Sequence, residues 1–170
     1  MTYDGRTRRS THPMIPPVSV VIVEDHPAYR AALVALLEPH PRVVVTGEAE
    51  TVGQALQLIR ATTPDVVLLD LRLGDEDGLD VARQLRADGQ PVAILVLTSQ
   101  DRPTDLWRAL TSGANGYALK SSSAVTLLDA VLEAAEGEAF ITPELADRLT
   151  RESLDTLRAA SAPMATPTTG

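Results

Sequence analysis

The chain has 170 residues, 44% of them hydrophobic and 22% charged, and a formal net charge of −8. These values are typical of a water-soluble globular protein, and the acidic balance argues against a domain that grips DNA by itself, because such domains are usually basic. The chain has no cysteine, which excludes a disulfide framework, thiolate zinc sites and a cysteine nucleophile, and suits a reducing, cytoplasmic location. Residues 1–17 are polar and broken by prolines, without the apolar segment of a secretory signal, and are predicted to form a disordered leader.

From Val18 onward, short apolar runs alternate with segments whose apolar residues recur at helical spacing. The predicted strands are 18–23, 43–46, 66–69, 92–97 and 117–119, and the predicted helices are 27–37, 52–61, 79–87, 104–112 and 124–136. The strand runs are almost continuously apolar, which is typical of parallel strands covered by helices on both faces. The pattern therefore predicts an α/β domain with a doubly wound, five-stranded parallel sheet over residues 18–141.

The composition changes beyond Gly137. Thr142 and Pro143 are favourable at a helix start, as a capping hydroxyl and a first-turn proline, and a weak leucine stripe follows. Residues 142–160 are predicted to form an extra C-terminal helix that serves in linking or dimer contacts. Residues 161–170 have low hydrophobicity and are predicted to be a disordered tail.

Polar residues follow the apolar runs at the end of four predicted strands. They are Glu24 and Asp25, then Asp70, then Thr98 and Ser99, then Lys120. Right-handed crossovers bring the carboxyl ends of parallel strands to one edge of the sheet, where ligands bind in this architecture. Three acids at one edge require a cation, and oxygen-only ligation favours Mg²⁺ or a similar hard ion. Lys120 and Thr98 suit an anion held opposite that metal, so the set is suited to phosphoryl transfer onto Asp70.

The segments VIVEDHP, VVLLDLRLGDEDGLD, ILVLTSQ and GANGYALK resemble bacterial response-regulator receiver domains in order, residue type and spacing. The resemblance covers residues 18–141, is strongest to the NarL/FixJ (LuxR-type) group, and implies a flavodoxin- or CheY-like fold. It implies three functional sets. The phosphoacceptor is Asp70, assisted by Thr98 and Lys120; the ligands of Mg²⁺ or Mn²⁺ are Glu24, Asp25, Asp70 and the backbone carbonyl of Arg72; the switch residues are Thr98 and Tyr117.

The resemblance also implies partners. A sensor histidine kinase would donate the phosphoryl group, a homodimer is an open alternative, and the output would be transcription. Regulators of this group normally continue into a helix-turn-helix, and about 30 residues after Ile141 are too few for that module. Either such a domain was removed or the chain is a stand-alone receiver, and DNA contact is expected only through that absent module. No apolar stretch approaches the roughly 20 residues of a membrane helix, so no membrane partner is expected.

Other interpretations of the same residues remain open. One alternative is a pseudo-receiver, which would act as a constitutive interaction module without phosphorylation. A phosphorylated receiver, by contrast, would not be an enzyme in the usual sense, because it would catalyse only its own phosphorylation and dephosphorylation. A phosphohydrolase of the haloacid-dehalogenase kind needs a second acid two residues after the nucleophile, and Arg72 stands there instead. Asp70 alone could cap a turn, Lys120 could be a surface cation, and Tyr117 could be a static core aromatic.

One position departs from the family pattern. Gly74 stands where receivers usually have proline, four residues after Asp70, so we expect altered loop dynamics or metal affinity without loss of phosphorylation. His26 is interpreted as a residue of a helix start with no catalytic role. Trp107 lies off the apolar stripe of its helix and is a candidate contact residue, with partial burial as the alternative.

Overall fold

Six parallel strands form the central sheet, in the order β2-β1-β3-β6-β7-β8. The computed structural model describes residues 15–100, 102–143, 145–147 and 150–151, and all structural statements concern this part of the chain. The strands are β1 (Val18–Val23), β2 (Val43–Ala49), β3 (Val66–Asp70), β6 (Ala93–Thr98), β7 (Gly116–Leu119) and β8 (Phe140–Ile141). The predicted α/β architecture with a doubly wound parallel sheet is confirmed.

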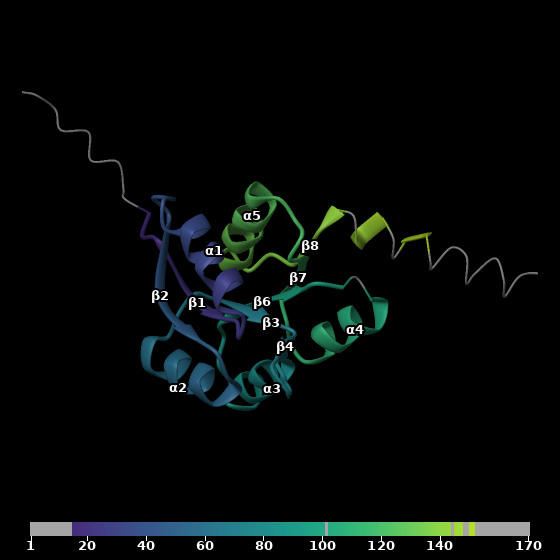
Figure 1. Ribbon diagram of the computed structural model, residues 1–170, viewed down its shortest axis with the longest axis horizontal. Coiled ribbons are helices and arrows are strands. Elements are labelled where there is room, and N and C mark those ends of the chain that lie inside the picture. Colours follow the sequence, from purple (N-terminus) through teal and green to yellow (C-terminus); the bar gives the residue numbers. More distant parts are fainter. Residues whose placement is uncertain (1–14, 101, 144, 148–149, 152–170) are drawn as a thin grey trace, which may run out of the picture.

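Five helices cover the two faces of the sheet. They are α1 (Pro27–Leu37), α2 (Val52–Thr62), α3 (Leu79–Ala87), α4 (Pro103–Thr111) and α5 (Ala124–Ala135). Helices α1 and α5 lie on one face, and α2 and α3 lie on the other (Figure 1). Two buried clusters fill the layers: one joins the sheet to α1 and α5, and the other joins it to α2, α3 and α4. Strand β3 is buried along its whole length because helices cover both of its faces, as its apolar run predicts.

The sheet has one strand more than the five predicted. Strand β8 pairs with β7 only through Gly116 with Phe140 and Tyr117 with Ile141. Two residues carry no periodicity, so no sequence pattern could assign them to a strand. Strand β2 also continues three residues beyond its predicted end, through a bulge at Thr46 whose hydroxyl donates to the Val20 carbonyl.

The loop after Asp70 contains an antiparallel ribbon that the sequence did not predict. It consists of β4 (Arg72–Leu73) and β5 (Glu76–Asp77), joined by a tight turn at Gly74 and Asp75. Gly74 has a φ of +60°, a left-handed conformation that most residues avoid, and glycine adopts it without steric cost. The ribbon turn therefore favours glycine at this position.

The C-terminal prediction is only partly covered by the structure. Residues 143, 145–147 and 150–151 are helical, while the rest of the predicted helix up to residue 160 lies outside the described residues, as do 1–14 and 161–170. The Thr142 hydroxyl was predicted to cap this helix, but among the described residues it has no hydrogen-bond partner; the Thr142 carbonyl accepts from Leu145 and Ala146 instead. None of the helices in the described ranges is both long and apolar enough to cross a membrane.

Candidate functional site

The sheet brings the predicted polar side chains together at the carboxyl ends of β1, β3 and β7. Glu24 directly follows β1, Asp70 is the last residue of β3, and Lys120 directly follows β7. The Lys120 Nζ lies 2.6 Å from Oε2 of Glu24 and 2.9 Å from Oδ2 of Asp70. Lys120 is the only lysine of the chain, and the other fourteen basic residues are arginines. The sequence predicted this convergence, and the structure confirms it.

Three carboxylates of the site can supply oxygen ligands to one ion. One oxygen from each of Glu24, Asp25 and Asp70 lies within 4.8 Å of the other two. Glu24 is 1% exposed and Asp70 is 8% exposed, whereas Asp25 is more open to solvent. An all-oxygen set that is partly open to water fits a hard divalent cation, which keeps several water ligands. The acidic cluster could therefore hold a metal ion.

Burial and charge act in opposite directions on this cluster. Burial raises the pKa of the Glu24 carboxyl, and the nearby Asp70 raises it further, while the hydrogen bond from Lys120 lowers it. Burial also lowers the pKa of Lys120, but its hydrogen bonds to Glu24 and Asp70 outweigh burial and hold that pKa above the usual value. Lys120 is therefore a cation at neutral pH that balances part of the acidic charge.

Tyr29 forms one wall of the site. The Lys120 Nζ lies 4.7 Å from the centre of the Tyr29 ring, a cation–π distance, and the Tyr29 hydroxyl donates a long hydrogen bond of 3.4 Å to the Lys120 carbonyl. Burial, followed by the charges of Glu24 and Asp70, raises the pKa of Tyr29 to about 12. A cleft of about 650 Å³ opens beside this ring, and Asp70 and Arg72 also line it.

The two predicted switch residues lie on neighbouring strands. The Thr98 hydroxyl makes its contacts within its own loop, because it donates to the Gln100 carbonyl at 3.1 Å and accepts from the Gln100 amide at 3.2 Å. Tyr117, on β7, is fully buried in the cluster beneath α2, α3 and α4. Thr98 thus lines the same groove as Asp70 and makes its hydrogen bonds to Gln100, and whether Thr98 or Tyr117 switches stays a prediction.

The loop after Asp70 is tied to its surroundings on three sides. The Gly74 amide donates to Oδ2 of Asp25 at 2.9 Å, and Oε2 of Glu76 accepts from the Val52 amide at the start of α2. On the third side, Asp77 pairs with Arg108 of α4 at 2.8 Å and with Arg83 of α3 at 3.2 Å. The expected effect of Gly74 on loop dynamics or metal affinity stays a prediction, but the structure shows an amide contact to Asp25 that proline could not make.

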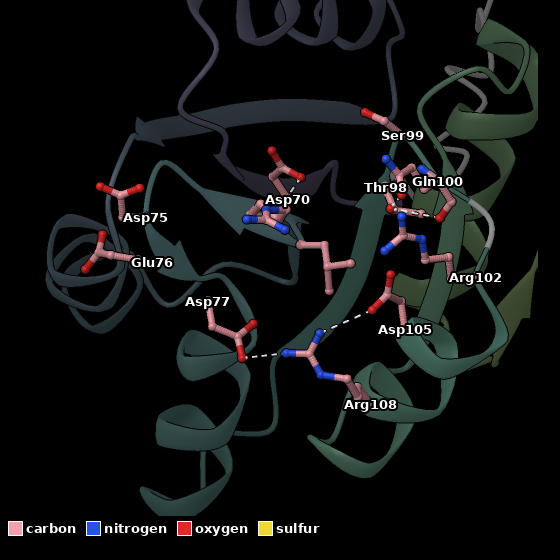
Figure 2. A pocket seen from close by; sticks show the side chains of 12 residues that line it. Asp70, Asp75, Glu76, Asp77, Thr98, Ser99, Gln100, Arg102, Asp105 and Arg108 are labelled. Atoms are coloured by element: carbon pink, nitrogen blue, oxygen red, sulfur yellow. Dashed lines mark hydrogen bonds and ion pairs between the residues drawn. The ribbon is translucent and has the colours of Figure 1, made fainter.

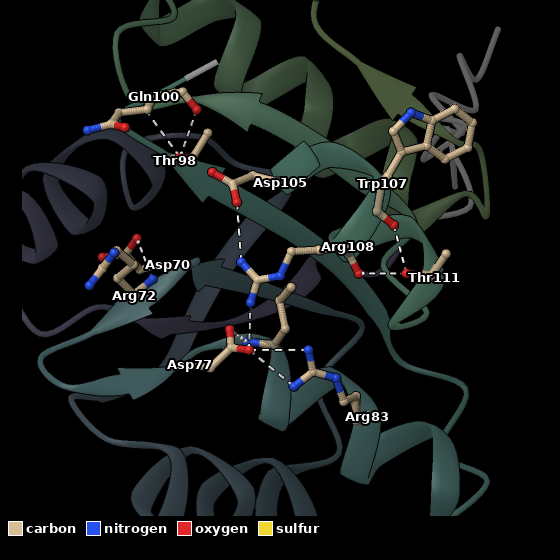
Figure 3. Close-up of polar contacts among 11 residues, drawn as sticks. Asp70, Arg72, Asp77, Arg83, Thr98, Gln100, Asp105, Trp107, Arg108 and Thr111 are labelled. Carbon is tan, nitrogen blue, oxygen red and sulfur yellow. Dashed lines mark hydrogen bonds and ion pairs between the residues drawn. The ribbon is translucent and has the colours of Figure 1, made fainter. Parts of the chain in front are cut away.

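A groove of about 570 Å³ separates the loop after Asp70 from α4. Figure 2 shows Asp70 at its inner end and Arg108 between Asp77 and Asp105. Figure 3 shows the same ion pairs from another side, with the Trp107 side chain pointing away from them. Trp107 is 63% exposed, which confirms its place off the apolar stripe and excludes the alternative of partial burial.

Two further predicted residues lie at the rim of the cleft. Arg72 donates its amide to Oδ1 of Asp70 at 3.3 Å and lines the cleft, so the ligand role of its carbonyl stays a prediction. His26 is exposed and contributes its backbone amide, which donates to Oε1 of Glu24 at 3.1 Å.

Comparison with known proteins agrees with this geometry. The family model described as the response regulator receiver domain matches residues 20–132. The chain belongs to this family. It is 37% identical to the transcriptional regulatory protein NarL of Mycobacterium tuberculosis over 91% of this chain and 70% of that protein. It is 38% identical to the nitrate/nitrite response regulator NarP of Escherichia coli over 74% of this chain and 58% of that protein.

A solved structure shows the same relationship. The chain resembles a LuxR-family two-component response regulator from an Aurantimonas species, with a TM-score of 0.78 and 31% identity, over 81% of this chain and 99% of that one. The chain is thus a LuxR-type receiver domain, and its relatives are regulatory proteins rather than metabolic enzymes.

Three contributors to the site were missed by the sequence reasoning. Tyr29 and Arg30 lie on the first turns of α1, where the residue pattern indicated only a helix, and the Gly74 amide belongs to the unpredicted ribbon. The only sequence signal was position. Tyr29 and Arg30 follow the acidic pair so closely that the first turns of α1 place both residues beside that pair. Some of their partners are distant in sequence, such as Lys120 for Tyr29 and Glu50 for Arg30, so the residue pattern could not identify those contacts.

Proposed function

We propose that this receiver domain is a phosphorylation-dependent switch in which Asp70 accepts a phosphoryl group from a phosphohistidine on a sensor histidine kinase. One observation carries the proposal: an almost buried carboxylate at the end of β3 lies 2.9 Å from the only lysine, beside two further acids. A structural acid at a strand end needs neither the lysine nor the acidic pair, whereas phosphoryl transfer needs both.

The proposed transfer follows from the groups present. An oxygen of Asp70 attacks phosphorus, the bond between phosphorus and the imidazole nitrogen of the kinase breaks, and that nitrogen then takes a proton. Lys120 is placed to pair with a phosphoryl oxygen, and the Thr98 hydroxyl would exchange its Gln100 partner for another such oxygen. Attack by water on phosphorus later releases inorganic phosphate and restores Asp70.

A divalent cation fits the same site. Glu24, Asp25, Asp70 and the Arg72 carbonyl would hold Mg²⁺ or Mn²⁺, which when bound would neutralise charge on the phosphoryl oxygens. The cluster of carboxylate oxygens supports this assignment, because without a cation the acids would repel one another and the incoming phosphoryl group.

We propose a transcriptional output through partners of this domain. The relatives include regulators of transcription and of nitrate and nitrite responses, but this chain spans only 58% of NarP. DNA contact would require a helix-turn-helix outside the residues considered, and a second copy of the chain is the other candidate partner. Light scattering with and without beryllofluoride would show whether phosphorylation drives dimerisation.

Intact-mass spectrometry after exposure to acetyl phosphate and Mg²⁺ tests the proposal directly. The wild-type protein should gain ~80 Da, the mass of one phosphoryl group, and the Asp70→Asn variant should not. A wild-type protein that binds Mg²⁺ and gains no mass would instead be a pseudo-receiver. Equal gains in both proteins would place the phosphoryl group on another residue.

A further inference from the structure

A largely buried arginine contacts the acidic turn formed by Glu24 and Asp25. Arg30 lies in the first turns of α1, and its side chain is 13% exposed. Its Nη1 donates to the Glu24 carbonyl at 2.6 Å. Its Nε and Nη2 lie 3.2 Å from Oε2 of Glu48 and 2.7 Å from Oε1 of Glu50. The guanidinium thus clamps the end of β1 to the end of β2 and the turn that follows it.

The carbonyl that Arg30 holds belongs to the peptide joining Glu24 to Asp25. Every other polar atom of Glu24 is also engaged: the amide donates to Ala49, Oε1 accepts from His26, and Oε2 accepts from Lys120. Rotation of the Glu24–Asp25 peptide would change the direction in which the Asp25 carboxylate projects. In the described ranges, Arg30 is the only side chain that donates a hydrogen bond to that peptide oxygen, so it limits this rotation.

We propose that Arg30 is a positioning residue for the divalent cation, which it serves by fixing the peptide that carries Asp25. This inference rests on the proposed function, because it concerns the metal that the acidic cluster would hold. Partners that orient metal ligands typically change metal affinity by 10–100-fold when they are removed. The fork of the guanidinium suits this task, because one rigid group reaches three acceptors on two segments of chain.

The positioning role and a simple charge effect predict opposite results. Arg30 is a cation close to the proposed Mg²⁺ ligands, so charge alone predicts that its removal strengthens Mg²⁺ binding. Loss of positioning predicts that removal weakens Mg²⁺ binding, because the peptide bearing Asp25 then loses the hydrogen bond that fixes its carbonyl oxygen. The sign of the change therefore separates the two effects.

The test is calorimetric titration of the full chain with Mg²⁺, before any phosphorylation. Arg30→Met should bind Mg²⁺ about tenfold more weakly than the wild type. Arg30→Lys keeps the charge that balances Glu48 and Glu50 and so protects the fold. One ammonium group cannot reach all three acceptors, so this variant should also bind Mg²⁺ several-fold more weakly than the wild type. Arg60→Met removes a comparable but exposed pair with Asp88 and should bind like the wild type. Mg²⁺ binding by Arg30→Met at wild-type strength or tighter would overturn the proposal.

A second readout separates this inference from the proposed function. With acetyl phosphate, the Mg²⁺ concentration for half-maximal phosphorylation should rise about tenfold in Arg30→Met, while the rate at saturating Mg²⁺ should stay near that of the wild type, because Asp70 and Lys120 are unchanged. An equal loss of rate at every Mg²⁺ concentration would show a general structural defect and contradict the positioning role. If even the wild type takes up no phosphoryl group, the proposed function fails, and calorimetry still decides the role of Arg30.

Discussion

The backbone amide of Gly74 donates a hydrogen bond of 2.9 Å to Oδ2 of Asp25 and so joins the loop after Asp70 to the acidic turn after β1. The two residues are 49 positions apart, and both flank the cluster that could hold a metal ion. Glycine at this position does two things that proline cannot do: it keeps the amide donor, and it adopts the left-handed conformation of the ribbon turn. Glycine in place of the proline that the resemblance implies therefore provides a hydrogen bond to the acidic turn.

Gly74→Pro should destabilise the protein and weaken Mg²⁺ binding. Proline cannot adopt a φ of +60° and has no amide to offer Asp25, so we expect a loss of at least about 1–3 kcal/mol in the free energy of unfolding. Gly74→Asn is the matched control, because asparagine tolerates this conformation, keeps the amide, and has open space for its Cβ. Urea unfolding of both variants provides the comparison, and equal stabilities would show that the turn is not constrained.

Gly78→Ala should displace Asp70. A Cβ at Gly78 would lie 2.0 Å from the Asp70 carbonyl oxygen, a backbone atom that cannot yield without moving the strand end. We expect a loss of about 2–3 kcal/mol in unfolding free energy and slower phosphorylation by acetyl phosphate. Gly53→Ala, in α2 with nothing within 4 Å of its Cβ, should instead stabilise by about 0.5–1 kcal/mol. Equal changes in unfolding free energy for Gly78→Ala and Gly53→Ala would show that the backbone contact at Gly78 does not constrain Asp70.

Lys120→Met should destabilise the protein at neutral pH by about 3 kcal/mol, because it leaves the Glu24 carboxylate buried without its cation. Burial raises the pKa of Glu24, so at a given acidic pH Glu24 is protonated to a larger extent in the folded protein than in the unfolded chain. The penalty of the variant should therefore shrink as the pH falls and Glu24 takes up a proton. Urea unfolding of wild type and variant across the acidic range measures this, and a constant difference would contradict it.

Stability should fall at alkaline pH because of Tyr29. Its pKa is raised from 10.0 to about 12, so the folded state holds the phenol proton more tightly than the unfolded state. The resulting stabilisation is complete below pH 10.0 and is lost as the pH rises through about 12. Tyr29→Phe keeps the ring beside Lys120 and should remove this part of the alkaline loss. The difference in near-ultraviolet absorbance between the wild type and the variant should show the late-titrating phenol of Tyr29, which the variant lacks.

Sequence patterns could predict the layers and the central site for a definite physical reason. Buried parallel strands must be apolar along their length, so polar groups at their ends are conspicuous, and topology rules bring those ends to one edge. This was enough to group Glu24, Asp70 and Lys120. It was not enough for β8 or for the ribbon at Gly74, because two-residue strands have no period and are held by contacts that form only after folding.

Sequence alone thus determined which residue types stand at the sheet edge, and the structure confirmed that they meet. Only the tertiary structure decided which side chains and backbone groups contact one another within the site. Lys120 lies on the ring of Tyr29, Arg30 clamps the acidic turn to the end of β2, and the Gly74 amide faces Asp25. The reason is that hydrogen bonds and ion pairs depend on distances of about 3 Å and on donor direction, which packing of the whole chain sets. Local patterns carry periodicity but not those distances.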